Sequence, residues 1–199
     1  QIVNFPVFGY VDSENPWKKI KNCLPSTDSA KIFAEFDNLN VTKFQGLQTV
    51  FDGHFEDLTP FVQKMRLIKS QDEIDKMIVA GQFADKAVKV GFDNISLNNT
   101  ETDIIAMIEF EMKKQGVEKM SFDTMVLTGN NAANPHGIPG TNKIENNALL
   151  LFDLGTDMYG YASDMTRTVA VGKPDQFKKD IYNLCLEAHM SALEFIKPG

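Results

Sequence analysis

The pattern of apolar and polar positions is most distinctive near the C-terminal end, where two β-type runs stand close together. Residues 148–154 are apolar except for one acid, Asp153, and residues 161–171 are rich in Thr, Val and Tyr. A second acid, Asp164, lies in the later run, and the Gly-bounded stretch 155–160 between the runs has the composition of a turn. These residues predict a β-hairpin.

Counting residues predicts how the two acids of this hairpin are placed. The midpoint of Asp153 and Asp164 falls between Met158 and Tyr159, so a turn centred there makes the acids direct cross-strand neighbours, with Cβ atoms roughly 4.5–5.5 Å apart. Like charges in that position destabilise a sheet, and an acid in an apolar strand is costly unless it is paired. The pair therefore calls for a shared proton or a cation such as Mn²⁺. The alternative is an ordinary hairpin in which Asp164 caps a turn and Asp153 ends a strand.

Helical periodicity dominates the middle of the chain. Ser70 and Glu73 form a capping-box pattern that opens a long helix to about Gly91, and the segment 55–69 before it reads as a connecting helix. The long helix is expected to bury one apolar face, made of Ile74, Met77, Ile78, Gly81, Ala84, Ala87 and Val88. Further helices are expected from Thr100 to Gly116 and after Asp175.

The first part of the chain alternates element types and predicts a small α/β module at residues 1–60. The expected elements are a strand at Ile2–Tyr10, a helix at Trp17–Leu24, a strand at Lys31–Phe36, and a helix or strand at Val41–Phe51. The predicted fold class of the whole chain is therefore α/β (α+β), with helices and strands mixed.

A loop rich in Gly, Asn and Pro, residues 128–140, lies between a short strand candidate at Phe122–Leu127 and the hairpin. His136 is its one titratable group, and Gly137 permits close approach of a substrate backbone. A loop histidine that is simply exposed is the alternative. His136 is a functional candidate because it immediately precedes the acidic hairpin, whereas His54 and His189 have no such neighbours.

Composition narrows the possible partners. The 199 residues carry 20 Lys and Arg against 27 Asp and Glu, a net charge of −7 that argues against nucleic acid and anionic membranes. No apolar run approaches the ~20 residues that span a bilayer. Cys23 and Cys185 follow no ligand spacing and are expected to be free thiols in a reducing compartment. These features predict a soluble, cytoplasmic protein.

Four segments carry a resemblance to a known family. They are R-x-I-K-S-x-x-E-I at 66–74, N-P-H-G at 134–137, F-D-L-G at 152–155 and G-Y-x-S-D-M-T-R-T at 160–168. In this order they resemble the pita-bread metallopeptidases, most closely Xaa-Pro dipeptidases (prolidases) and aminopeptidase P. The resemblance implies a partial N-terminal module at 1–60, followed by an incomplete pita-bread catalytic domain at 61–199.

The resemblance also implies roles for particular residues. Asp153 would bind one metal of a pair and Asp164 would bridge both, with Mn²⁺ the expected metal. His136 would lie beside the scissile amide, and Thr166 and Arg167 would support the bridging acid. The implied substrate is a short proline-containing peptide cleaved before proline, and the implied full-length assembly is a homodimer.

The remaining ligands implied by the resemblance are one histidine and two glutamates on segments after Gly199. The chain is therefore expected to be a fragment, inactive by itself, of an enzyme of roughly double its length. Alternatives within the fold are aminopeptidase P activity on longer peptides, a creatinase-like hydrolase without metal, and an inactive binding module. The last two are disfavoured because such relatives lack the acid pair, and methionine aminopeptidase is disfavoured by the upstream α/β module.

Overall fold

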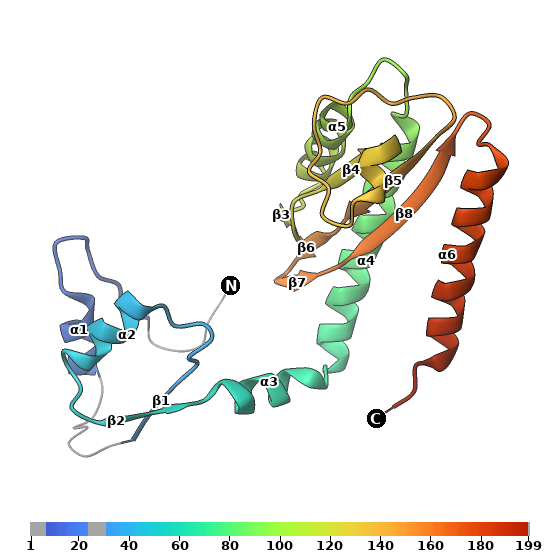
Figure 1. Ribbon diagram of the computed structural model, residues 1–199. Coiled ribbons are helices and arrows are strands. Elements are labelled where there is room, and N and C mark those ends of the chain that lie inside the picture. The colour runs from blue at the N-terminus through green and yellow to red at the C-terminus, as the bar shows by residue number, and fades with distance from the viewer. Residues whose placement is uncertain (1–6, 24–30, 199) are drawn as a thin grey trace. The chain divides into compact units, whose positions relative to one another are not determined.

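The chain divides into two compact units in the computed structural model, which describes residues 7–23 and 31–198. The units are Gln1–Lys69 and Ser70–Gly199 (Figure 1). The division falls between Lys69 and Ser70, whereas the sequence placed it after residue 60. The helix that crosses the expected boundary, α3 (Thr59–Leu67), thus belongs to the first unit.

The first unit contains α1 (Pro16–Cys23), β1 (Lys31–Ala34), α2 (Val41–Gln48), β2 (His54–Asp57) and α3. Its two strands pair in parallel, with Lys31 opposite His54. The α/β character of this region is confirmed, and the ambiguous segment 41–51 is mainly helical.

Two expectations for the first unit are wrong in detail. The helix expected over residues 55–69 begins only at Thr59, because β2 runs to Asp57 and the Asp57 carboxylate accepts the Thr59 N–H at 2.9 Å. No strand is formed at residues 7–10, and the start of the strand expected there, residues 2–6, lies outside the described residues.

The second unit begins with two helices that start as the sequence predicted. Helix α4 (Gln71–Asp93) opens with a capping box between Ser70 and Glu73, and α5 (Glu101–Lys114) opens with one between Thr100 and Asp103. The buried residues of α4 are Ala80, Ala84, Ala87, Val88 and Gly91. The expected apolar face is wrong at its start: Ile74, Met77 and Ile78 are exposed, because the first turns of α4 extend past the sheet (Figure 1).

The described residues of the second unit also form six strands. The main sheet has the order β4–β5–β8 and is antiparallel, with β4 at Met125–Thr128, β5 at Ala148–Leu154 and β8 at Met165–Val171. A smaller sheet of order β3–β6–β7 is formed by Lys119–Met120, Thr156–Met158 and Tyr161–Ala162. Its first strand, β3, was not predicted, and β6 lies within the stretch 155–160 that was predicted to be a turn.

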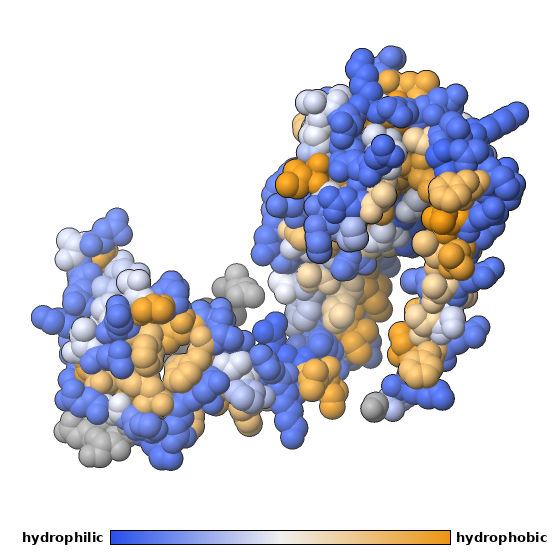
Figure 2. Space-filling view, viewed as in Figure 1, coloured by the Kyte–Doolittle hydropathy of each residue, from blue (hydrophilic) through white to orange (hydrophobic). Residues whose placement is uncertain are grey.

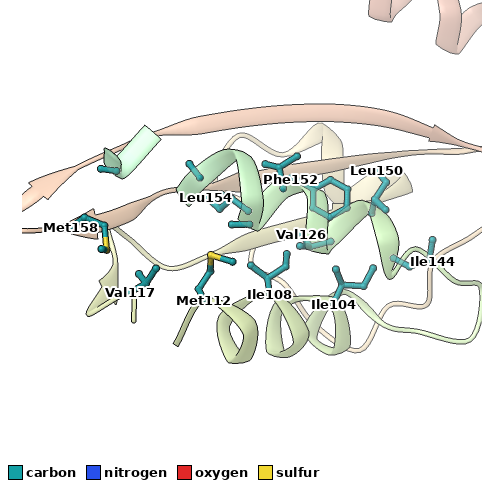
Figure 3. Close-up of a cluster of buried hydrophobic side chains, with 14 residues drawn as sticks. Ile104, Ile108, Met112, Val117, Val126, Ile144, Leu150, Phe152, Leu154 and Met158 are labelled. Carbon is teal, nitrogen blue, oxygen red and sulfur yellow. The ribbon is translucent and has the colours of Figure 1, made fainter. Parts of the chain in front are cut away.

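The core lies between one face of the main sheet and helices α4 and α5. Alternate residues of β5 are buried, as expected for a strand with one face in a core. Figure 3 shows Ile104, Ile108 and Met112 of α5 between that helix and strand β5, which carries Phe152 and Leu150. Phe152 is fully buried and packs edge-to-face on Phe92, with ring centroids 5.2 Å apart.

The last helix, α6 (Gln176–Phe195), starts where the sequence predicted, with Asp175 as its N-cap. None of its residues is buried, and Figure 2 shows apolar side chains along it. The exposed members include Phe177, Leu184, Leu193 and Phe195. No helix in the described part of the chain is long and apolar enough to cross a membrane.

Candidate metal-binding hairpin

The predicted hairpin is present, but its register differs from the prediction by two residues. Asp153 lies opposite Thr166, not opposite Asp164. The same register continues through β6 and β7, where Met158 pairs with Tyr161. The prediction that the two acids pair directly was therefore wrong. In a regular ladder this register would make Asp153 and Asp164 diagonal neighbours, about 7–8 Å apart.

The turn conformation explains the shift. The two residues between Met158 and Tyr161 are Tyr159 and Gly160, which have φ values of 57° and 80°. Two consecutive left-handed residues are typical of a type I′ hairpin turn, whose twist matches that of the strands. The hairpin is consequently centred on Tyr159 and Gly160.

Close backbone packing fixes the segment that leads into Asp164. The Ser163 carbonyl oxygen lies 1.9 Å from the place where a Cβ on Gly155 would be, so only glycine fits there. The Ser163 hydroxyl accepts the Thr156 N–H at 2.9 Å, and the Thr156 hydroxyl donates to the Ala80 carbonyl at 2.9 Å. These contacts tie the residue before Asp164 to β6 and α4.

Asp153 lies on the sheet face that points away from the core, since its neighbours Phe152 and Leu154 are buried against the helices. Its carboxylate is half-buried, and its Oδ1 accepts the Thr166 hydroxyl at 3.0 Å. Met125 lies opposite Asp153 on the other neighbouring strand. Among residues 7–23 and 31–198, no basic side chain forms an ion pair with Asp153 or Asp164.

The structure brings Thr166, but not Arg167, to the face of Asp153. Arg167 lies opposite Phe152 in the register, and its Nη1 donates to the Thr166 carbonyl at 2.8 Å. Asp164 is exposed and lies between β7 and β8. The supporting role expected of Arg167 stays a prediction, and any contribution from its observed position would come through the backbone of Thr166.

His136 is exposed in the loop between β4 and β5, which includes a short 3₁₀ helix, η1 (Gly129–Ala133), where the sequence had predicted no regular element. The His136 N–H donates to Asn134 Oδ1 at 3.1 Å. A Cβ on the next residue, Gly137, would lie 2.8 Å from Cδ1 of Leu127. Because Leu127 pairs with Leu151 on the outer face of the sheet, the loop and Asp153 share that face.

Glu101 is a polar residue of this region that the sequence interpretation missed. It is fully buried, and its carboxylate accepts hydrogen bonds from both ends of the His136 loop. The sequence showed it only as a helix-start acid beside the capping box, and periodicity gives no signal that such an acid is buried.

The fold matches that of a metallopeptidase family. Residues 75–199 match the model of metallopeptidase family M24, and the chain belongs to this family. The predicted fold class and the resemblance to pita-bread peptidases are thereby confirmed.

Similar proteins cover nearly the whole chain. An uncharacterized peptidase of Staphylococcus aureus (strain MRSA252) is 41% identical over 194 residues, which are 97% of this chain and 54% of that protein. The prolidase of Pyrococcus horikoshii OT3 is 32% identical with a TM-score of 0.86, over 98% of this chain and 55% of that chain. The X-Pro aminopeptidase of Thermotoga maritima MSB8 is 28% identical with a TM-score of 0.85, over 95% and 54%. The chain thus spans about half the length of these relatives.

Enzymes of the family use divalent metals, and the chemistry of the hairpin fits such an ion in part. Asp153 and Asp164 offer carboxylate oxygens, which suit Mg²⁺, Ca²⁺ and Mn²⁺. The half-buried carboxylate of Asp153 has one hydrogen-bond donor and no paired cation in the described part of the chain. However, no three His, Cys, Asp or Glu residues are grouped as a metal site within the described ranges, so these two acids supply only part of a ligand set.

Proposed function

We propose that this chain carries part of the active site of a metal-dependent peptidase that hydrolyses the bond before proline in Xaa-Pro dipeptides. The observation that supports this most strongly is the position of Asp153. It is an acid on the outer face of an otherwise apolar strand, oriented by Thr166 and without a basic partner in the described chain. Asp164 lies two residues before Thr166 along the chain, just outside the β5–β8 ladder, and the loop of His136 shares the sheet face of Asp153.

The proposed roles follow from the chemistry of these groups. Bound divalent ions, with Mn²⁺ our expected metal, would lower the pKa of a water molecule and polarise the carbonyl under attack. Asp153 and Asp164 would hold the ions, and Thr166 would keep the Asp153 carboxylate in one orientation. The His136 imidazole would hydrogen-bond the charge that develops on the scissile amide. A bond before proline is a tertiary amide without an N–H, so a dedicated site is required.

We further propose that residues outside these 199 complete the ligand set, with one histidine and two glutamates as the expected ligands. The basis is that the relatives are about twice as long as the matched region. From the resemblance of the sequence segments we also expect the full-length protein to form a homodimer. The exposed thiols of Cys23 and Cys185 favour a reducing, cytoplasmic location.

A second candidate function is that of aminopeptidase P, which acts on longer Xaa-Pro peptides. The similarity to the Thermotoga maritima X-Pro aminopeptidase favours this alternative. A third, a catalytically inactive binding module, is disfavoured because both acids are retained.

The test is hydrolysis of an Xaa-Pro dipeptide and an Xaa-Pro-Xaa tripeptide by the full-length protein in Mn²⁺. The wild type should cleave the dipeptide faster, and Asp164→Ala should abolish both activities while the circular dichroism spectrum is retained. Asp123→Ala, which removes an exposed acid outside the hairpin, is the matched control and should keep full activity. Faster cleavage of the tripeptide would favour aminopeptidase P, and unchanged activity of Asp164→Ala would refute the ligand assignment.

A further inference from the structure

Glu101 is a buried acid whose side-chain hydrogen-bond partners all lie in the segment 128–142, which carries His136. Its side chain has no solvent exposure, and its carboxylate accepts hydrogen bonds from four residues. The donors are the Thr128 N–H at 2.8 Å, the Gly140 N–H at 2.8 Å, the Asn142 Nδ2 at 3.1 Å, and the Asn131 Nδ2 at 3.1 Å to each oxygen. These residues come from the start, the η1 turn and the end of the loop that carries His136.

The donor set requires an acceptor at both oxygens of the Glu101 side chain. Oε1 faces the Thr128 N–H and Oε2 faces the Gly140 N–H, while the Asn131 amide reaches both. Because buried polar groups must be paired, an ionised carboxylate satisfies every donor of this arrangement and an amide cannot. No basic side chain pairs with Glu101 in the described part of the chain, so the loop amides alone compensate its charge.

Asn131 connects Glu101 to the residues that follow His136. Its Nδ2 also donates to the Ile138 carbonyl at 3.1 Å. A Cβ on Gly137 would lie 3.0 Å from the Asn131 carbonyl oxygen and 3.1 Å from its Oδ1, so the backbone of Gly137 packs directly on Asn131. A continuous series of contacts therefore runs from Glu101 through Asn131 to the backbone on the C-terminal side of His136.

We propose that Glu101 is a positioning residue for His136: it acts as a buried, acceptor-only anchor that holds both ends of the loop and so fixes where the imidazole stands. The catalytic consequence rests on the proposed function, in which His136 acts at the scissile amide. The structural consequence, an ordered loop, does not depend on that function.

Variants at Glu101 separate the charge from the shape of the side chain. Glu101→Gln keeps the shape but places an NH₂ group against N–H donors, so the loop must rearrange. Asp103→Asn is the matched control: it changes another acid of the same helix start, in the capping box, and this residue bonds Thr100 instead of the loop. Asn131→Ala removes the connecting amide and leaves Glu101 with its other donors, which provides a second variant should Glu101→Gln fail to fold.

The structural test is NMR of this 199-residue chain, which contains only three histidines. In Glu101→Gln and Asn131→Ala, the imidazole of His136 and the amides of His136 and Gly137 should shift and broaden, whereas the imidazoles of His54 and His189 should not. Asp103→Asn should leave all three histidines unchanged. Identical His136 and Gly137 signals in a folded Glu101→Gln or Asn131→Ala chain would overturn the proposal.

The catalytic test uses the full-length protein. Glu101→Gln should lower kcat by roughly 100-fold with little change in KM, because misplacing a group that acts in the transition state affects kcat. It should cause no further loss in a His136→Ala background. An equal loss in both backgrounds would overturn positioning through His136. An unchanged kcat in His136→Ala alone would instead refute the proposed role of His136, with the NMR result standing independently.

Discussion

Asp153 and Thr166 form the contact on which the proposed site depends. The Thr166 hydroxyl donates to one carboxylate oxygen at 3.0 Å, which leaves the other oxygen for a different partner. A hydrogen bond of this kind orients a metal-binding carboxylate, and loss of such partners typically lowers metal affinity or activity by about 10–100-fold.

Thr166→Val is therefore expected to weaken Mn²⁺ binding to the full-length protein by about 10–100-fold while preserving the side-chain shape. Thr168→Val is the control, since Thr168 lies on the same face of β8 but pairs with Leu151. Calorimetric titration measures both affinities. Equal affinities of Thr166→Val and wild type would show that the hydroxyl does not orient a ligand.

At the scale of single residues, the sequence singled out Asp153 and His136 as candidates but gave no sign of Glu101. Asp153 stands out in an apolar strand, and a loop histidine before it is easily noticed. Glu101 is different, because an acid in the first turn of a helix normally faces solvent and favours the helix dipole. Its burial depends on the course of a loop about 30 residues away in sequence, which no local pattern records.

Among the elements, the starts of α4 and α5 were predicted correctly because a capping box is a local signal, whereas α3, which has no side-chain cap, begins four residues later than expected. Ser70 and Glu73 form the expected reciprocal hydrogen bonds, and Thr100 and Asp103 form a second capping box at a helix start that the sequence also predicted. The hairpin register was not predicted, since the count assumed a turn symmetric about two acids. A left-handed Tyr159 is uncommon for a non-glycine residue, and its conformation could not be inferred from composition.

Helix α4 contains two glycines whose replacement should have opposite effects. In Gly91→Ala the new Cβ would lie 2.6 Å from Cε1 of Phe152 and 3.0 Å from Cδ1 of Ile108, so overpacking should cost about 1–3 kcal/mol. Gly81→Ala meets nothing within 4 Å and should stabilise the chain by about 0.5–1 kcal/mol through helix propensity. Urea unfolding measures both. A stabilising Gly91→Ala would contradict the packing of α4 on β5.

The start of α5 should give the chain a measurable acid sensitivity. Hydrogen bonds to the Asp103 carboxylate hold its pKa below the ordinary value of 3.8. The larger effect comes from the Thr100 N–H and the smaller from the Thr100 hydroxyl. A lowered pKa means that the ionised form contributes stability above about pH 3.8, and this contribution is lost as the pH falls through the lower folded pKa. Asp103→Asn should therefore be less stable than wild type at neutral pH, and the difference should shrink in acid. Unfolding midpoints across pH 2–7 test this, and a difference that is independent of pH would contradict it.

For the whole molecule, the second unit has a core on one face of its sheet and candidate chemistry on the other. Asp153 and the loop of His136 lie on that outer face, and α6 has no buried residue. The chain matches about half of each relative, which agrees with a site that further residues must complete. The proposed division of the metal site rests on the sequence resemblance, because hydrophobic periodicity describes only the elements of this chain and carries no information about ligands elsewhere.

The most direct test of this account is calorimetric titration of Mn²⁺ into the full-length protein, its Asp164→Ala variant, and the 199-residue chain. We predict two tight Mn²⁺ sites in the full-length wild type and in the Asp123→Ala control. Tight Mn²⁺ binding should be lost in Asp164→Ala, and the 199-residue chain should lack a pair of tight sites. Two tight sites in the 199-residue chain, or wild-type binding by Asp164→Ala, would contradict the claim that these acids form one part of a shared metal site.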